Sequence, residues 1–358
     1  MDGTALLYCE GWFGLPSGKT ANGLVRHTER YRVIGVLDSR YAGRDAGEVL
    51  DGTPKGIPVF SGLESALERL PEKPDYIVLG LAPDGGMLPP EHREPLKAAL
   101  RKGINLDSGL HEFLADDPSF AEAARAGGAS IRDIRKSPPR KELHFWSGEI
   151  GKVTATKVAI LGTDSAIGKR TTCQLLRKEL LLDGIASAMV GTGQTAWFQG
   201  VPHTMLLDAT VNDFVAGELE HAVCRAFEDL SPRVILIEGQ GCLTHPAYPG
   251  GFEIIGACRP DFLIVQHAPA RRCYDGFPGI PLAGLDRELA IMRLLTPAPL
   301  LAITVNHENM TPEEARASAM RLQEQYGVPC VAPLLGSCAP IVKNLGVRRH
   351  SCTVNLSN

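Results

Sequence analysis

The chain has 358 residues, of which 44% are hydrophobic and 22% charged, and its 41 acidic and 37 basic residues give a formal net charge of −4. This length suits two domains, each large enough to bury its own core. The apolar content excludes an intrinsically disordered chain, and the nearly balanced charge gives no reason to expect a polyanionic partner such as a nucleic acid.

Cysteine usage and hydropathy indicate the cellular setting of such a chain. The nine cysteines are scattered, odd in number and without a C-x-x-C pair, which favours reduced thiols and argues against a bound structural metal. The segment Met1–Thr4 leads straight into a strand, without the basic and apolar regions of a secretory signal. No apolar run approaches the roughly 20 residues that span a bilayer. We therefore expect a cytoplasmic protein without a membrane partner.

Strand-like and helix-like segments alternate from the N-terminus onward, which is typical of parallel sheets with crossover helices. Helical patterns at Gly62–Arg69 and Glu91–Lys102 lie between some of these strands. The predicted strands of the first part are Ala5–Cys9, Arg32–Leu37, Ile57–Phe60, Tyr76–Leu81 and Ile104–Asp107. This alternation predicts a Rossmann-like domain over residues 1–136.

The first strand is followed by a turn, Gly14–Thr20, that partly matches a phosphate loop because it ends in Gly-Lys-Thr. Its spacing is one residue short, however, and Pro16 removes a backbone donor. A dinucleotide fingerprint is also incomplete, since Gly11 and Gly14 do not supply G-x-G-x-x-G, although Asp38 ends the second strand where a ribose-binding acid could lie. We interpret the segment as a tight Rossmann-like turn, with a ligand-contacting turn facing the second domain as the alternative.

Two prolines and mixed charge interrupt the alternation at Ser137–Glu142, so we place the interdomain linker at residues 137–150. Residues 151–358 then repeat the alternation with more apolar strands. The predicted strands are Lys157–Leu161, Ser187–Val190, Val234–Ile237, Phe262–Val265, Leu300–Val305 and Cys330–Pro333, and the predicted helices are Gly168–Leu182, Val211–Leu230, Asp286–Leu295 and Pro312–Tyr326. We therefore predict an α/β protein whose C-terminal domain is a P-loop NTPase-like, doubly wound parallel sheet.

The most informative segment joins the first of these strands to the first of these helices. A glycine-rich loop between a strand and a helix presents backbone N–H groups and the positive helix end to phosphate, and a lysine adds charge. The predicted phosphate contacts are Gly162, Thr163, Asp164, Ser165, Ile167, Gly168, Lys169, Arg170, Thr171 and Thr172. The common pattern G-x4-G-K-[ST] fails twice, because five residues separate the two glycines and an arginine follows the lysine. A hydroxyl for magnesium would have to come from Thr171 or Thr172.

Polar residues follow the other strands of this domain, at the edge where ligands bind in doubly wound sheets. Gln194 and Thr195 lie in a flexible loop after the second strand, and Asp213 follows Asp208 near the start of a helix, where an acid is commonly a cap. Glu238 ends the third strand, in the position that holds magnesium or activates a nucleophile in nucleotide-binding domains.

Two histidines and two arginines continue this series. His245 and Tyr248 lie in a loop after Glu238, and His267 ends the fourth strand four residues before Arg271 and Arg272. A histidine there can act as a base or bind an anion, and the arginines can bind a carboxylate or simply be solvated. The fifth strand ends at Asn306, where a base edge could be read.

Taken together, these motifs resemble a known family. The loop from Gly162 to Lys169 is similar to that of dethiobiotin synthetase and of cobyrinic-acid amide-forming ligases. The ordered set is closer to the D-glutamate N-acetyltransferase family, a two-domain family long of unknown function. The motifs that carry this resemblance are Gly162–Thr172, Thr192–Thr195, Asp208 with Asp213, Phe214 and Gly217, Glu238–Gly241, His245–Tyr248, and Asp261 with His267. Ala196 departs from the expected pattern, where another glycine would be usual.

The resemblance implies acetyl transfer from acetyl-CoA to the amino group of D-glutamate, in D-amino-acid catabolism. The candidate catalytic bases are Glu238 and His267, followed by Asp213 and His245, and the candidate substrate contacts are Gln194, Thr195, Tyr248, Arg271 and Arg272. A competing function is a ligase or kinase that uses ATP and magnesium, and a third is a nucleotide-sensing protein without catalysis. Small molecules are the expected ligands, and apolar sheet edges favour a homo-oligomer.

Overall fold

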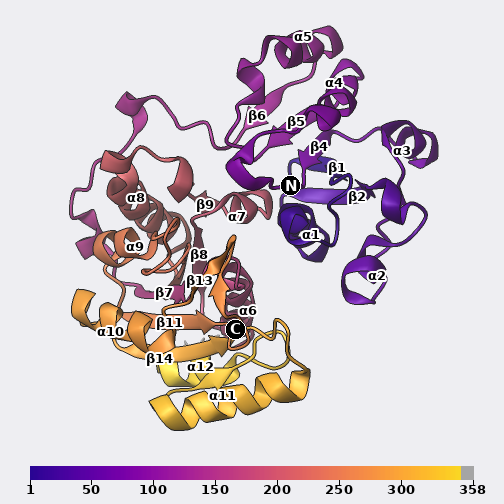
Figure 1. The fold of residues 1–358 in the computed structure, drawn as a ribbon. Helices are drawn as coiled ribbons and strands as arrows, with labels where there is room; N and C mark the ends of the chain where they lie inside the picture. The colour runs from indigo at the N-terminus through magenta and orange to yellow at the C-terminus, as the bar shows by residue number, and fades with distance from the viewer. Residues whose placement is uncertain (348–358) are drawn as a thin grey trace, which may run out of the picture. The chain divides into compact units, whose positions relative to one another are not determined.

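The structure of the chain, a computed structural model, describes residues 1–347 and divides into two compact units. Unit 1 comprises Met1–Pro138 together with Gln194–Pro202, and unit 2 comprises Pro139–Gly193 together with the chain from His203 onward. The chain therefore leaves unit 2 after Gly193 and returns to it at His203. Figure 1 labels the helices and strands and colours them along the chain.

Unit 1 contains a six-stranded parallel sheet in the order β3-β2-β1-β4-β5-β6. The strands are β1 (Gly3–Tyr8), β2 (Tyr31–Leu37), β3 (Val59–Phe60), β4 (Tyr76–Leu79), β5 (Asn105–Ser108) and β6 (Ile131–Asp133). The helices are α1 (Lys19–Arg26), α2 (Ala46–Asp51), α3 (Leu63–Arg69), α4 (Arg93–Arg101), α5 (Pro118–Gly127) and α7 (Gln194–Phe198). This strand order is that of the Rossmann fold, so the predicted Rossmann-like domain is confirmed.

Side chains on the two faces of this sheet form two separate cores. Along β1, Ala5 and Leu7 face one core whereas Leu6 and Tyr8 face the other, because successive strand residues point to opposite faces. Phe198 of α7 is fully buried in the first of these cores. The segment Gln194–Pro202 is therefore an integral part of unit 1 although it comes from the middle of unit 2.

Unit 2 contains a seven-stranded parallel sheet in the order β15-β14-β11-β7-β10-β8-β9 and a separate antiparallel hairpin. The sheet strands are β7 (Thr156–Gly162), β8 (Ser187–Gly191), β9 (His203–Thr204), β10 (Val234–Glu238), β11 (Phe262–His267), β14 (Leu300–Val305) and β15 (Cys330–Val331), and the hairpin is β12 (Cys273–Tyr274) with β13 (Phe277–Pro281). The helices are α6 (Lys169–Leu182), α8 (Asn212–Leu230), α9 (Gly251–Cys258), α10 (Leu285–Leu295), α11 (Pro312–Tyr326) and α12 (Ala339–Leu345). The predicted P-loop domain is thus confirmed, with β7 at the centre of the sheet.

Short 3₁₀ helices complete the two units. They are Pro16–Gly18, Ser39–Tyr41, Asp84–Gly86, Pro90–His92, Leu114–Asp116, Arg140–Glu142, Glu149–Lys152 and Leu207–Ala209. No helix within residues 1–347 is both long enough and apolar enough to cross a membrane.

The predicted long elements match the structure closely, and the differences lie in short ones. β14 and α11 have the predicted bounds, and the Thr311 side chain and Glu314 form a reciprocal capping box at the start of α11. The last predicted strand is shorter than expected, since β15 ends at Val331. The sequence pattern also missed several elements, most of them too short to establish a period, and these are β6, β9, the hairpin and helices α2, α5, α7, α9 and α12.

Candidate functional site

The loop of residues 163–168, which we call the phosphate loop, joins β7 to α6 at the carboxyl edge of the unit 2 sheet. Parallel strands all end at one edge, so the residues that follow β8, β10, β11 and β14 collect around this loop. The loop itself is unusual because Ala166 adopts a left-handed conformation (φ 51°), which costs a residue with a Cβ atom about 1–2 kcal/mol.

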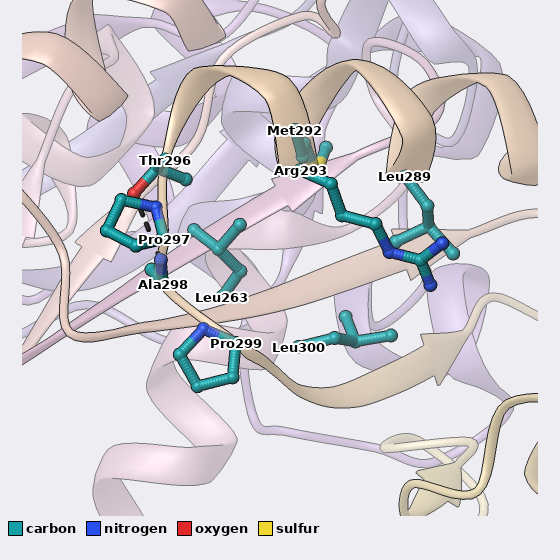
Figure 2. Close-up of a pocket in the computed structure, with 9 residues that line it drawn as sticks. All are labelled: Leu263, Leu289, Met292, Arg293, Thr296, Pro297, Ala298, Pro299 and Leu300. Atoms are coloured by element: carbon teal, nitrogen blue, oxygen red, sulfur yellow. Dashed lines mark hydrogen bonds between the residues drawn. The ribbon is translucent and has the colours of Figure 1, made fainter.

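A hollow in unit 2 lies at the opposite edge of the same sheet. It is lined by Leu263 at the start of β11, by Leu289 and Met292 of α10, and by residues 296–300, which lead into β14 (Figure 2). Leu263 is four residue steps from His267 at the other end of β11, which corresponds to roughly 13 Å. The hollow is therefore remote from the phosphate loop.

Lys169, the first residue of α6, is buried and turned back onto the protein. Its Nζ donates to the backbone oxygen of Asp164 at 2.6 Å and to that of Gly241 at 2.8 Å. Burial lowers the pKa of its ammonium group to about 8. The charge predicted to contact phosphate is thus held between the phosphate loop and the turn that follows β10.

The hydroxyl that holds magnesium in common phosphate loops has no counterpart in its usual position. Arg170 stands there, and Thr171 and Thr172 lie one and two positions further along α6, which rotates them by about 100° and 200° around the helix axis. Thr172 is buried, and its hydroxyl donates to Oε1 of Gln266 at 2.5 Å. Neither threonine therefore reproduces the usual arrangement.

Asp164 of the phosphate loop is the centre of a buried ionic network. Its Oδ2 accepts hydrogen bonds from Nη1 of Arg271 at 2.8 Å and from the backbone N–H of Asp275 at 3.0 Å. The same guanidinium group donates to the backbone oxygen of Ser165 and to the carboxylate of Glu308. Arg271, predicted as a carboxylate anchor, is thus already paired with two carboxylates.

His245 lies against the same aspartate and is fully buried. Its Nδ1 accepts hydrogen bonds from the backbone N–H groups of Ala247 and Tyr248, at 3.1 and 3.0 Å, so the ring proton resides on Nε2 when the ring is neutral. Nε2 faces Oδ1 of Asp164 at 3.4 Å. Burial lowers the pKa of His245, and Nδ1 would have to release both backbone N–H groups before it could accept a proton.

Glu238 ends β10 and is buried beside the same loop. Its Oε2 accepts a hydrogen bond from the backbone N–H of Thr192 at 3.0 Å, and the Thr192 hydroxyl donates to the Glu238 backbone oxygen. Burial raises the pKa of the Glu238 carboxyl, against the opposing effect of the Arg170 charge. A buried carboxyl with a raised pKa at this edge is a candidate for proton transfer.

His267 ends β11 on the other side of β7. Its Nδ1 lies 3.0 Å from the hydroxyl of Thr163 in the phosphate loop, and burial lowers its pKa to about 4. The ring is therefore neutral at physiological pH. The nearby Asn306 donates from Nδ2 to the backbone oxygen of Ile167 at 2.7 Å, so its amide supports the loop.

The other predicted residues lie outside this cluster. Asp213 is exposed in the first turn of α8, Arg272 is exposed after β11, and the ring of Tyr248 is about half exposed, 4.8 Å from the His245 ring. Gln194 and Thr195 belong to unit 1, where Oε1 of Gln194 accepts a hydrogen bond from Arg135 at 2.9 Å.

In unit 1, Asp38 occupies the position of a ribose-binding acid, and its carboxylate is already paired with an arginine of the same chain. Asp38 is fully buried, and its carboxylate accepts hydrogen bonds from the backbone N–H of Phe13 and from the guanidinium group of Arg40. The segment that follows Phe13 forms the 3₁₀ helix Pro16–Gly18 and then α1. These bonds fix the turn after β1 and give Asp38 a structural role.

Sequence reasoning missed the residues that support the site from the hairpin and from α10. Asp275 Oδ2 accepts a hydrogen bond from Ser165 Oγ at 2.8 Å, and buried Glu288 of α10 accepts hydrogen bonds from the backbone N–H groups of Leu243 and Thr244. One signal was available: Asp275-Gly276 between two strand-forming residues is a strong short hairpin pattern. No such signal marks Glu288.

Comparison with known proteins places both units in one family. Residues 144–342 match the model of a P-loop domain described as a domain of unknown function, DUF1611_C, and residues 39–137 match the Rossmann-like DUF1611_N domain. The two-domain family expected from the motifs is thereby confirmed.

Named relatives and a solved structure cover most of the chain. A protein named D-glutamate N-acetyltransferase from Tritonibacter scottomollicae is 32% identical over 72% of this chain and 77% of its own length. A protein of the same name from Pseudoalteromonas sp. is 30% identical over 81% of this chain and 87% of its own length. The crystal structure of a DUF1611 family protein from Anabaena variabilis has a TM-score of 0.87 at 27% identity, and the match covers 96% of this chain and 99% of that one.

Proposed function

The chain belongs to the DUF1611 family, and we propose that it is an N-acetyltransferase that transfers the acetyl group of acetyl-CoA to the amino group of D-glutamate. The names of two relatives at 30–32% identity over most of the chain support this proposal. One structural observation carries it further: the site has a phosphate loop with a buried lysine but an arginine in place of the magnesium-binding hydroxyl. Such a loop suits a phosphate-bearing carrier such as CoA better than a phosphoryl donor.

The proposed reaction has one proton to remove and one anion to stabilise. The ammonium group of D-glutamate first releases one proton to solvent, and the neutral amine nitrogen then attacks the thioester carbonyl carbon. The resulting tetrahedral oxyanion collapses as the C–S bond breaks. The products are N-acetyl-D-glutamate and CoA thiolate, which takes up the proton that the base removed from the amine. The protein must therefore supply a base, donors for the oxyanion and contacts for the phosphates.

Glu238 and His267 remain the two candidate bases. A base is most effective when its pKa is near the operating pH, and burial raises the pKa of Glu238 whereas it lowers that of His267 to about 4. This contrast favours Glu238 as the base. His267, bonded to Thr163 of the phosphate loop, then orients the loop.

The remaining roles follow from charge and exposure. Lys169 and the N–H groups of the phosphate loop contact the phosphates of CoA. A substrate carboxylate can be bound by Arg272, which is exposed, or by Arg271 if it exchanges a carboxylate of the protein for that of the substrate.

A ligase or kinase that uses ATP and magnesium is the competing function. The observation that favours it is the place of Glu238, since an acid at the end of a strand beside a phosphate loop holds magnesium in many nucleotide-binding domains.

A single assay separates the two functions. Thiol release from acetyl-CoA is followed with D-glutamate or L-glutamate, with and without EDTA, and in parallel ATP hydrolysis is followed with magnesium. We expect thiol release with D-glutamate, one N-acetylated product per thiol, and no loss of rate with EDTA. Strict dependence on magnesium together with stoichiometric ATP consumption would transfer the assignment to the ligase or kinase.

A further inference from the structure

The turn after β10 holds one side chain, Gln240, in a fixed place next to the candidate base. The glycine before it is pressed against β7, since a Cβ atom at Gly239 would lie 2.2 Å from the backbone oxygen of Ile160. The glycine after it has φ 58°, and a Cβ atom at Gly241 would lie 1.6 Å from the backbone oxygen of Tyr248. Close contacts on both sides therefore leave the backbone of Gln240 little freedom to move.

The carboxamide of Gln240 is not fully used by the protein. Its Oε1 is buried and accepts no hydrogen bond from any residue that the structure describes. Its Nε2 lies 3.8 Å from the place that a Cβ atom at Gly193 would take, and the preceding residue, Thr192, donates its backbone N–H to Glu238. The Gln240 carboxamide and the Glu238 carboxylate thus flank the same turn, residues 192–193.

Buried polar atoms of folded proteins nearly always have a partner, so an unpartnered buried oxygen calls for an explanation, and a ligand that supplies the missing donor is one. An amide oxygen and a carboxylate are both acceptors, and together they match a group with several N–H donors, such as a primary amine. We propose that Gln240 accepts a hydrogen bond from the amino group of the substrate and orients that group toward Glu238. This inference rests on the proposed acetyl transfer and adds to it the residue that recognises the amine.

The test separates recognition of the amine from general binding. Glutarate has the two carboxylates of D-glutamate but no amino group, so it serves as a competitive inhibitor that cannot use Gln240 in the proposed way. The variants are Gln240→Met, which keeps the side-chain length and removes the acceptor, and Gln240→Glu, which keeps an acceptor. Gln325→Met, at an exposed position of α11, is the matched control. The measurements are the KM for D-glutamate, the KM for acetyl-CoA and the inhibition constant of glutarate.

We expect Gln240→Met to raise the KM for D-glutamate about 10- to 150-fold, the range for one lost hydrogen bond to a charged group. The KM for acetyl-CoA and the inhibition constant of glutarate should stay within about twofold of wild type, and Gln240→Glu should recover part of the loss. An unchanged KM for D-glutamate, or an equal weakening of glutarate, overturns the inference while acetyl transfer stands.

Two further outcomes are also decisive. If wild-type protein releases no thiol with any amine, the proposed function fails and the inference fails with it. If Gln240→Met does not fold, as judged by its thermal unfolding, the same comparison is made with Gln240→Ser, in which a shorter side chain cannot reach the amine.

Discussion

We expect the buried charge of Lys169 to lower the stability of the folded protein and to strengthen the binding of CoA. The variant Lys169→Met tests both effects. The ammonium group is buried, and its pKa of about 8 in the folded protein lies below the ordinary value of 10.5. At 1.36 kcal/mol per pKa unit, burial disfavours the charged form by about 3 kcal/mol. Methionine removes this cost but leaves the carbonyl oxygens of Asp164 and Gly241 without their donor, at about 1–3 kcal/mol each. We therefore expect the free energy of unfolding at pH 7 to change by no more than about 3 kcal/mol.

The pH dependence of stability gives the sharper result. Below pH 8 Lys169 carries its proton in both the folded and the unfolded state, so the cost of burying the charge is fully present. Between pH 8 and 10.5 the folded protein has lost this proton whereas the unfolded chain retains it, so the wild type becomes more stable as the pH rises. Above pH 10.5 the contribution is constant. The wild type should therefore gain about 3 kcal/mol over Lys169→Met across this window.

Urea unfolding of both proteins at intervals from pH 7 to 10.5 measures this difference, and calorimetric titration with CoA at pH 7 measures binding. Loss of one ionic hydrogen bond to phosphate should weaken CoA binding by roughly 10- to 150-fold. A stability difference that does not change with pH would mean that Lys169 is solvated rather than buried. Equal CoA affinity of the two proteins would refute its role at the phosphate.

Two further predictions concern the base and the turn after β10. Glu238→Gln and His267→Asn are assayed separately for thiol release with D-glutamate. The variant that removes the base should lose about 10²–10⁴ in kcat while it still binds CoA. Near-normal turnover in both variants would place the base elsewhere, with Asp213 or His245 next to be tested. Gly241→Ala should lower the free energy of unfolding by about 2–4 kcal/mol, because the new methyl group meets the Tyr248 backbone oxygen at a left-handed position. Gly256→Ala, in α9 with open space around the new methyl group, should change it by less than about 1 kcal/mol, and equal effects in chemical denaturation would contradict this geometry.

The sequence predicted the fold well where segments were long and periodic. The central strand β7 and the helices α6 and α11 could all be read from local patterns, because the apolar period of each is visible within its own segment. The insertion of Gln194–Pro202 into unit 1 could not, since nothing in those nine residues distinguishes them from an ordinary loop of unit 2. Their assignment depends on Phe198 and Trp197 packing against residues far away in the chain.

The same distinction explains what the sequence revealed of the site. The sequence pattern predicted that Glu238 and His267 lie at strand ends. Parallel pairing of these strands with β7 brings both residues to the edge that holds the phosphate loop. Their protonation could not be predicted, because the pKa of each depends on burial and on groups from other elements.

Arg271 shows most clearly how pairing in three dimensions changes an assignment. Its guanidinium group was predicted to bind a substrate carboxylate, yet it already holds the phosphate loop through Asp164 and the chain after β14 through Glu308. Breaking one partner away from a buried pair is costly, because it leaves the other charge uncompensated. A substrate carboxylate could replace Glu308, whose side chain is 38% exposed, far more easily than it could replace the fully buried Asp164. If Arg271 binds the substrate carboxylate, it therefore does so while it remains bonded to the phosphate loop. In that arrangement Asp164 connects the proposed site of D-glutamate to the proposed site of CoA.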